Sequence, residues 1–283
     1  MKIIECPRDA MQGLHDFIET DKKVAYINQL LHVGFDTLDM GSFVSPTAIP
    51  QMRDTAEVLN KINLENTNTK LLTIVGNERG ARQAAEFEQV QYLGFPFSIS
   101  ETFQKRNINS SIEDSFHRAE EILNTCVIKQ KDLVVYISMA FGNPYNDPWD
   151  ADIVLEWTHK LHNELGIEII SLSDTIGVAQ PETIRYLFNS LIPELPNVEL
   201  GAHLHTTPST WEEKVHAAVQ SGCVRFDGAF KGFGGCPMAK DDLTGNMPTE
   251  NLLDYFERKK IETGINKEAF DKAYQMTQSV FPM

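Results

Sequence analysis

The chain has 283 residues, of which 42% are hydrophobic, and 25 basic against 40 acidic residues give a formal net charge of −15 at pH 7. The length suits one eight-stranded α/β barrel, for which roughly 250 residues are typical, but it would also hold two ordinary domains. Sequence-independent nucleic-acid binding and attachment to anionic membranes need basic surface, so this acidic chain is a poor candidate for either. An anionic substrate would need a local basic patch.

The cysteines and the N-terminal segment predict a soluble protein in the reducing cytoplasm. No C-x-x-C pair occurs, which argues against a zinc ribbon or a thioredoxin-like site. The first residues, MKIIECPRDAM, contain an acid at Glu5 and no long apolar region, so they are not typical of a signal peptide. No run approaches the roughly 18 apolar residues of a membrane span. The four cysteines are Cys6, Cys126, Cys223 and Cys236.

Eight short apolar runs, rich in β-branched residues, are predicted as strands. Their spacing of roughly 25 to 40 residues is typical of βα units. They cover residues 2–6, 36–40, 70–75, 90–95, 132–140, 168–173, 198–205 and 223–229.

The segments between these runs carry helix signals. Ser110 with Glu113, and Ser209 with Glu212, fit the capping-box pattern at the start of a helix. Pro181 suits a first helical turn. Three glycines stand between a helical run and the next strand, as C-terminal caps do: Gly34, Gly166 and Gly222.

Regular alternation of strands and helices indicates a parallel sheet. Eight repeats without an obvious linker favour a closed (β/α)8 TIM barrel over an open doubly wound sheet. The absence of G-x-G-x-x-G after the first strand argues against dinucleotide binding. We expect one domain over residues 1–283, in which residues from about Thr249 to the end form additional C-terminal helices flanking the barrel.

Ionisable residues gather where one mouth of such a barrel would be. Chemistry in these barrels takes place at the C-terminal ends of the strands. Residues of this kind follow strands one, two, six, seven and eight: Arg8, Asp9, Asp39, Ser42, Ser171, Asp174, Thr175, His203, His205 and Cys236. Their convergence on one rim is a stronger signal than any single residue.

The pair His203-x-His205 is the sharpest local signal of a metal site. Side chains two residues apart on a strand point to the same side, so both imidazoles suit one ion. Asp9, after the first strand, would add a carboxylate. The plainer alternatives are two unrelated histidines near a loop, and a surface ion pair between Arg8 and Asp9.

Two further segments fall on the same rim. The glycine-rich run from 232 to 239, followed by Gly245-Asn246, permits close backbone approach to a ligand, although it also fits a flexible connector. Lys105-Arg106-Asn107 is the one local basic element there, and it also fits a solvated loop before a helix.

The segments PRDAMQ, SFVSPTAIPQMRD, FQKRNINSSIEDSF, SLSDTIG, AHLHTT, GFGGCPMA and TGNMPTE resemble the 3-hydroxy-3-methylglutaryl-CoA lyases of the DRE-TIM metallolyases. They run in order from residue 7 to about residue 250, and GFGGCP separates the lyases from the related synthases. The resemblance implies a (β/α)8 barrel, a Mg²⁺ or Mn²⁺ ion and cleavage of an acyl-CoA to acetoacetate and acetyl-CoA. It also suggests a homodimer; whether the pathway is leucine degradation stays open.

The resemblance also implies roles for individual residues. The metal ligands would be Asp9, His203, His205 and Asn246. Two imidazoles in that set leave Zn²⁺ or Co²⁺ open. Arg8 would be the catalytic arginine, and Cys236, on a mobile loop, a proton donor. The proton acceptor would be Asp39, Asp174 or His203, and the sequence does not choose among them. Substrate contacts would be Arg8, Ser42, Lys105, Arg106, Asn107, Ser171 and Thr175, with Lys105 and Arg106 at the CoA phosphates.

Four departures from the family pattern bear on the acyl substrate more than on the metal. Asp39 stands where glutamate is usual, Thr206 where aspartate commonly follows the second histidine, Ala10-Met11 where Gly-Leu is usual, and Asn143 where cysteine is common. They keep two alternatives open: a condensing synthase or aldolase on the same barrel, and a metal-dependent binding barrel with degraded catalysis.

Overall fold

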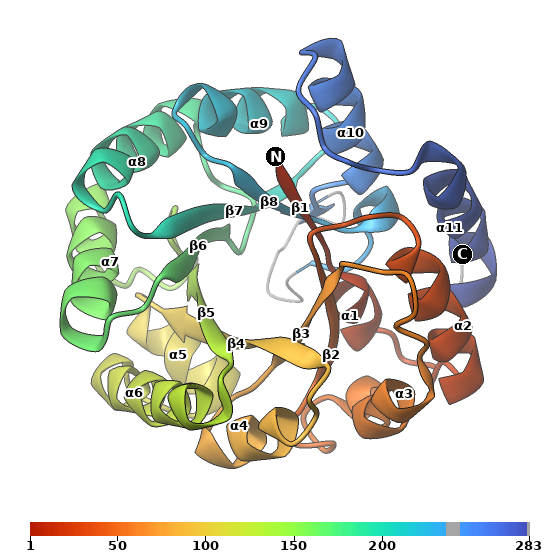
Figure 1. Cartoon of the computed structure of the whole chain (residues 1–283). Coiled ribbons are helices and arrows are strands. Elements are labelled where there is room, and N and C mark those ends of the chain that lie inside the picture. The colour runs from red at the N-terminus through yellow and green to blue at the C-terminus, as the bar shows by residue number, and fades with distance from the viewer. Residues whose placement is uncertain (236–243, 282–283) are drawn as a thin grey trace.

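The fold is a closed barrel of eight parallel strands (Figure 1). This computed structural model describes residues 1–235 and 244–281. Neighbours in the chain pair with each other, and β1 pairs with β8, which closes the barrel. The strands are β1 (Lys2–Glu5), β2 (Thr37–Ser42), β3 (Lys70–Ile74), β4 (Val90–Ser98), β5 (Asp132–Ser138), β6 (Ile169–Asp174), β7 (Glu199–Thr206) and β8 (Arg225–Gly228). Each overlaps one predicted run, so the predicted (β/α)8 TIM barrel is confirmed.

Helices lie around the strands, most of them in an outer ring (Figure 1). They are α1 (Pro7–Gln12), α2 (Thr20–Leu31), α3 (Thr55–Lys61), α4 (Glu78–Ala85), α5 (Glu101–Ile108), α6 (Ile112–Lys129), α7 (Ala151–Leu165), α8 (Pro181–Glu194) and α9 (Trp211–Gln220). The predicted C-terminal helices are present as α10 (Thr249–Arg258) and α11 (Lys267–Val280). α1 lies inside the outer ring next to β2, α10 packs on α9, and α11 packs on α2. No helix within the described ranges is both long and apolar enough to cross a membrane.

Both predicted capping boxes are wrong by one residue. α6 is capped by Ser111 rather than Ser110: the Ser111 hydroxyl accepts the N–H of Asp114 at 3.0 Å. α9 follows Thr210 rather than Ser209, and no side chain caps it. Because hydroxyl residues stand side by side at both places, the sequence pattern fits either neighbour equally well.

Two of the other predicted helix boundaries are confirmed: α8 begins at Pro181, and Gly166 caps α7 with φ 76°. Gly34 and Gly222 are not the caps themselves, because α2 is capped by His32 and α9 by Ser221. The two glycines follow these caps with φ values of 88° and 87°. Glycine reaches this left-handed conformation without the steric cost that a β-carbon adds.

A ninth strand, β9 (Gly245–Asn246), was not predicted. It runs antiparallel to the end of β7 and pairs Asn246 with His205. A strand of two residues has no alternation that a sequence could reveal. Its pairing nevertheless matters, because it returns the chain to the C-terminal mouth of the barrel.

Glu5, the last residue of β1, joins two segments that lie on either side of residues 236–243. Its buried carboxylate accepts the backbone N–H of Phe230 at 3.0 Å and the hydroxyl of Thr249 at the start of α10. Burial raises the pKa of Glu5 to about 8 in spite of these two donors. The folded protein therefore holds a proton on Glu5 more tightly than the unfolded chain does.

This raised pKa predicts a pH-dependent effect of Glu5→Gln. Between the ordinary value of 4.5 and the folded value of about 8, native Glu5 binds the extra proton. The free energy of unfolding should therefore fall as pH rises, by ~1 kcal/mol per pH unit. Glutamine mimics the protonated acid, so the variant should be more stable than wild type by a few kcal/mol near pH ~8 and little changed near pH ~5. Urea unfolding at both pH values measures this; a pH-independent difference would contradict it.

Candidate active site

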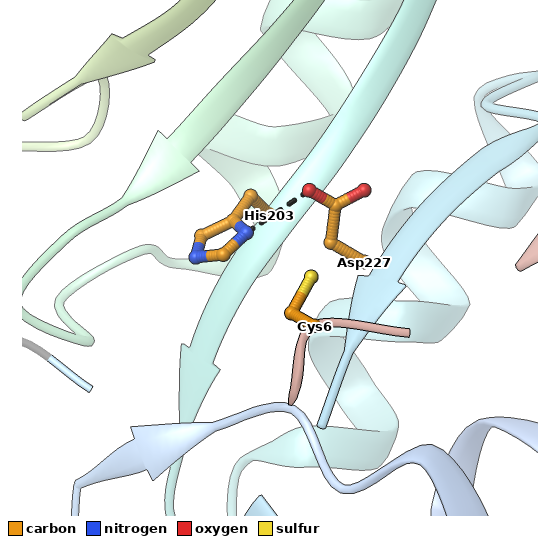
Figure 2. A group of neighbouring side chains, drawn as sticks. All are labelled: Cys6, His203 and Asp227. Atoms are coloured by element: carbon orange, nitrogen blue, oxygen red, sulfur yellow. Dashed lines mark hydrogen bonds and ion pairs between the residues drawn. The ribbon is translucent and has the colours of Figure 1, made fainter. Parts of the chain in front are cut away.

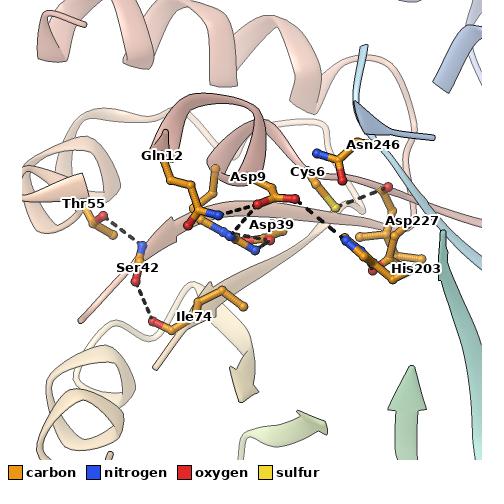
Figure 3. Close-up of polar contacts among 12 residues, drawn as sticks. Cys6, Asp9, Gln12, Asp39, Ser42, Thr55, Ile74, His203, Asp227 and Asn246 are labelled. Atoms are coloured by element: carbon orange, nitrogen blue, oxygen red, sulfur yellow. Dashed lines mark hydrogen bonds and ion pairs between the residues drawn. The ribbon is translucent and has the colours of Figure 1, made fainter. Parts of the chain in front are cut away.

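Residues from four distant parts of the chain meet at the C-terminal mouth of the barrel (Figure 3). Asp9 lies on α1 directly after β1, and Asp39 lies midway along β2. His203 belongs to β7 and Asn246 to β9. The pairing of β2 with β3 shifts register between Asp39 and Gly41, and such a bulge re-aims a side chain at a strand end.

Asp9, His203 and His205 present ligand atoms that all lie within 4.8 Å of one another. Nε2 of His203 is 3.8 Å from Oδ2 of Asp9, and the two imidazole rings are 5.4 Å apart. Gln12 and Arg8 both donate to the other carboxylate oxygen, Oδ1 of Asp9, which leaves Oδ2 directed at the histidines. One carboxylate and two imidazoles at this separation fit a single cation.

The charge states of two of these groups suit metal binding. Burial alone would raise the pKa of Asp9, but Arg8 and the two histidines outweigh it, so the pKa falls below its ordinary value. Burial, then His203, lowers the pKa of His205 to about 4. Asp9 is therefore ionised and His205 neutral, the forms that bind metals. Nδ1 of His205 is buried and has no hydrogen-bond partner among the described residues, which fits a nitrogen atom that is free to coordinate a metal ion.

Asn246, the last member of the predicted ligand set, lies on β9 and pairs in register with His205 of β7. Its amide Nδ2 donates to the carbonyl of Phe233 at 2.8 Å, so Oδ1 is the atom left for a cation. Gly234 packs tightly here: a β-carbon would lie 2.5 Å from the carbonyl oxygen of Asp9 and 2.9 Å from Nδ2 of Asn246. Only glycine permits this approach of the loop to the ligands.

Asp227 of β8 orients His203 and was not predicted (Figure 2). Its Oδ2 lies 3.0 Å from Nδ1 of His203 and has no solvent exposure, which leaves Nε2 to face Asp9. Burial alone would lower the pKa of His203, but the carboxylates of Asp227 and Asp9 raise it. Carboxylate–histidine–metal chains of this kind fix the imidazole orientation. The sequence carries no local signal for this contact, because only the register of β7 against β8 sets residues 203 and 227 opposite each other.

A second trio, Cys6 with His203 and Asp227, also lies within ligand distance but fits a metal less well. Nδ1 of His203 already bonds to Asp227. Burial, with the nearby carboxylates, raises the pKa of the Cys6 thiol well above its usual range, so the thiolate that binds metals does not form. The trio around Asp9 is the better candidate.

The contact of Asp227 with His203 predicts the effect of Asp227→Asn. The amide can still bond to Nδ1, but it supplies no charge to the imidazole. We expect metal affinity to fall by about 10- to 100-fold, as for other partners behind a metal ligand. Titration of apoprotein with Mn²⁺ measures this. The unfolding midpoint of the apoprotein should change little, and unchanged affinity would remove Asp227 from the metal centre.

Arg8 lies between the two acids of the mouth. Its Nε donates to both oxygens of Asp39, at 3.2 and 3.0 Å, its Nη2 to Oδ2 of Asp39, and its Nη1 to Asp9 at 3.1 Å. All three side chains are buried. Burial raises the pKa of Asp39 to about 6, although the Arg8 guanidinium opposes the shift. The arginine is thus a fixed cation next to the metal-binding carboxylate, and the alternative of a surface ion pair is wrong.

Asp174 lies beneath the mouth and is bound on both oxygens. Oδ2 pairs with Lys214 at 2.7 Å, and Oδ1 accepts the N–H of Ala179 at 3.0 Å. Lys214 also donates to the backbone oxygen of His205 at 2.9 Å. Burial raises the pKa of Asp174 even though Lys214 opposes this. The pair supports the strand end that carries His205, and a direct role for Asp174 in proton transfer stays a prediction.

The predicted substrate contacts divide into buried and exposed groups. Ser42 and Ser171 are buried at strands β2 and β6, and the Thr175 hydroxyl accepts the N–H of Met139 at 2.8 Å. The basic segment on α5 is exposed: Lys105, Arg106 and Asn107. α5 follows β4 and so lies on the predicted rim, where Lys105 pairs with Glu101 at 2.8 Å. Cys236 lies outside the described residues.

The chain matches the family model described as HMGL-like over residues 2–277. This chain belongs to the HMGL-like family. The HMGL-like relatives include the human mitochondrial hydroxymethylglutaryl-CoA lyase, which is 36% identical over 94% of this chain and 81% of its own length. They also include a 3-hydroxy-3-isohexenylglutaryl-CoA/hydroxymethylglutaryl-CoA lyase of Pseudomonas aeruginosa, 33% identical over 95% of this chain and 88% of its own.

Solved structures of HMGL-like proteins superpose closely on this chain. An HMG-CoA lyase from Acinetobacter baumannii, in complex with coenzyme A and 3-methylmalate, has a TM-score of 0.90 at 30% identity and covers 99% of this chain and 90% of its own. The Bacillus subtilis HMG-CoA lyase has a TM-score of 0.91 at 31% identity, over 98% and 92%. The predicted family is therefore confirmed.

Proposed function

We propose that this HMGL-like protein is a divalent-metal carbon–carbon lyase that cleaves 3-hydroxy-3-methylglutaryl-CoA, or a close 3-hydroxyacyl-CoA, to acetoacetate and acetyl-CoA. The observation that carries the proposal is the group of Asp9, His203 and His205 at the barrel mouth with Arg8 bonded beside it. The HMG-CoA lyases to which the chain is similar over nearly its full length support the same reaction.

Asp9, His203, His205 and Asn246 would hold the metal. Their mixed oxygen and nitrogen donors suit Mn²⁺ or Mg²⁺, while two imidazoles also admit Zn²⁺ or Co²⁺. A bound divalent ion supplies Lewis acidity, which lowers the pKa of a coordinated hydroxyl. Asp227 keeps Nε2 of His203 directed toward the ion by holding Nδ1.

Asp39 is the best placed of the three predicted proton acceptors. All three are paired: Asp39 with Arg8, Asp174 with Lys214, and Nδ1 of His203 with Asp227. Asp39 differs in that its partner is the proposed catalytic arginine, which also bonds to Asp9. A pKa of about 6 suits a base that works near neutral pH. Asp39 would take the proton of the tertiary hydroxyl. The C–O⁻ group then becomes a ketone, and the electron pair of the broken C–C bond passes to the enolate of acetyl-CoA.

Arg8 would stabilise the negative charge that develops on the thioester oxygen. Its guanidinium stays charged at any pH of interest and is held in place by two carboxylates, so it needs no reorganisation during the reaction. Cys236 would then protonate the enolate carbon, and Cys236→Ala should slow turnover by orders of magnitude without unfolding the protein. An unaffected rate would end that proposal. Lys105 and Arg106 would offset the acidic surface near the CoA phosphates.

The decisive experiment is an acetoacetate-release assay on the metal-supplemented protein with a small panel of 3-hydroxyacyl-CoA thioesters. We expect release from hydroxymethylglutaryl-CoA or a close analogue, and none after chelation. The rival is a condensing synthase or aldolase, which would instead consume acetyl-CoA with a 2-oxo acid. The panel is needed because Asp39 and Thr206 depart from the family pattern and bear on the acyl group.

We further propose a cytoplasmic location, a single functional domain and a homodimer, without a nucleic-acid or membrane partner. Cys6, Cys126 and Cys223 are buried free thiols, which supports a reducing compartment. The net charge of −15 argues against nucleic acid. The dimer rests on the family resemblance, and sedimentation equilibrium tests it.

A further inference from the structure

A fully buried arginine lies inside the barrel, one layer below the metal-binding residues. Arg225 stands two residues before Asp227 on β8, so both side chains enter the barrel interior. Its Nη1 donates to Glu199 at 2.9 Å, but its Nε and Nη2 have no partner among the described residues. An unmet buried donor is costly, more so when it carries charge.

Two buried hydroxyls in the same layer also lack partners. Tyr136 on β5 pairs in register with Ser171 on β6, then Gly201 on β7 and Arg225 on β8. The hydroxyls of Tyr136 and Ser171 have no partner among the described residues. A β-carbon on Gly201 would lie 3.0 Å from Cδ of Arg225 and 3.1 Å from Oγ of Ser171. The arginine stem therefore crosses β7 through the space that glycine leaves, toward Ser171.

The unmet groups of this layer suit a ligand that offers acceptor atoms. Glu199 is shared between Arg225 and Lys2, so it satisfies only Nη1 of the Arg225 guanidinium. The two unmet guanidinium nitrogens can only donate, whereas the hydroxyls of Tyr136 and Ser171 can donate or accept. The carboxylate of Asp227 balances part of the charge, and its Oδ2 is bonded to His203. A small anion that accepts from Nε, Nη2 and the two hydroxyls would satisfy all four groups together.

We propose that Arg225, Tyr136 and Ser171 form a binding site for one small monovalent anion, here named the Arg225 site. The ligand chemistry is that of a halide or a carboxylate group. It has two sources: a resident free anion, or the free carboxylate of the acyl substrate, which would rest on the proposed function. The ring of Tyr136 packs edge-on against the ring of His203, with 5.8 Å between the ring centroids. An anion bound to the Tyr136 hydroxyl would therefore be separated from this proposed metal ligand by one aromatic ring.

Halide-dependent unfolding of the metal-loaded protein tests the site without any lyase assay. Replacing isethionate, a bulky sulfonate that carries no carboxylate, by about 0.2 M chloride or bromide should raise the Tm of wild type by about 2–4 °C. Arg225→Met should abolish the shift. Gly201→Ala, which keeps every charge but fills the space beside the guanidinium, should also abolish it. Lys272→Met is the control, because it removes one positive charge on the exposed face of α11, where Lys272 pairs with Glu268 of the same helix, and it should keep the shift.

Kinetics separate the two sources. If the substrate carboxylate is the occupant, Arg225→Met should raise the KM for hydroxymethylglutaryl-CoA at least about tenfold, the effect of losing one charged hydrogen bond. The Ki of 3-hydroxy-3-methylbutyryl-CoA, which lacks that carboxylate, should stay unchanged. If a halide is resident, bromide soaks should give an anomalous peak at Arg225. The Arg225 site would be overturned if three results came together: no halide-dependent shift in Tm, no anomalous bromide peak, and equal changes in KM and Ki. Only water would then occupy this layer. A failed lyase assay with an intact halide shift would count against the proposed function alone.

Discussion

Replacing Arg8 by glutamine is expected to lower kcat by about 10²- to 10³-fold, with metal content unchanged. This is the size of effect seen when one fixed donor to a developing oxyanion is removed. Glutamine retains an amide donor but no charge, so the thioester oxygen would lose its cationic partner. Steady-state assays, together with metal analysis of the purified variant, measure the two quantities separately.

The ion pairs of Arg8 complicate this variant and also supply its control. Asp39 receives donors from Nε and Nη2, so Arg8→Gln leaves a buried carboxylate poorly paired, which costs about 3–5 kcal/mol of stability. Asp39→Asn in the Arg8→Gln background removes that charge, so the double variant should regain stability. Its kcat does not report on Arg8, because it also lacks the proposed proton acceptor. Wild-type kcat in Arg8→Gln, or metal loss in proportion to the loss of kcat, would make Arg8 a structural residue.

Replacing His205 by alanine should strip the metal from the purified protein, with affinity lowered by more than the roughly 100-fold effect of a residue behind a ligand. Activity should fall with it. The fold should survive, because Lys214 and β9 bond to the backbone at position 205 and not to its side chain. Metal analysis by mass spectrometry and circular dichroism measure the two outcomes.

His216→Ala is the matched control for this experiment. His216 is partly buried and bonds to Tyr255 at 2.8 Å, away from the metal-binding residues. It should keep its metal. If the His205→Ala protein retains stoichiometric Mn²⁺, His205 is not a metal ligand. Asp9 and His203 alone would then be too few ligands from this group to explain the binding.

Strands and the metal-binding trio follow from the sequence because their signals are local. Each strand is an apolar run, and the rule that strand ends carry the site places Asp9, His203 and His205 on one rim. The structure brings them together. The N-cap residues of α6 and α9 could not be predicted exactly from the sequence, because two adjacent hydroxyl residues fit the N-cap position at each helix.

The roles of Asp227 and Arg225 could not be predicted from the sequence, because they depend on the register between neighbouring strands. Both belong to a predicted strand, where they look like ordinary alternating polar residues. Only the pairing of β7 with β8 sets Asp227 opposite His203, and only the gap at Gly201 admits the stem of Arg225. A strand pattern shows which side chains face inward but not which inward side chains touch.

The closure of the barrel by β1 against β8 has a consequence for the order of events during synthesis. Synthesis runs from the N-terminal to the C-terminal side, so the partners of Asp9 on β7 and β9 are made some two hundred residues after it. Until β8 has left the ribosome, β1 has one open edge and no metal-binding group exists. The growing chain therefore displays an unpaired edge for most of its translation, and such edges invite association with other chains. Catalytic competence would appear abruptly, once β8 and β9 have been made.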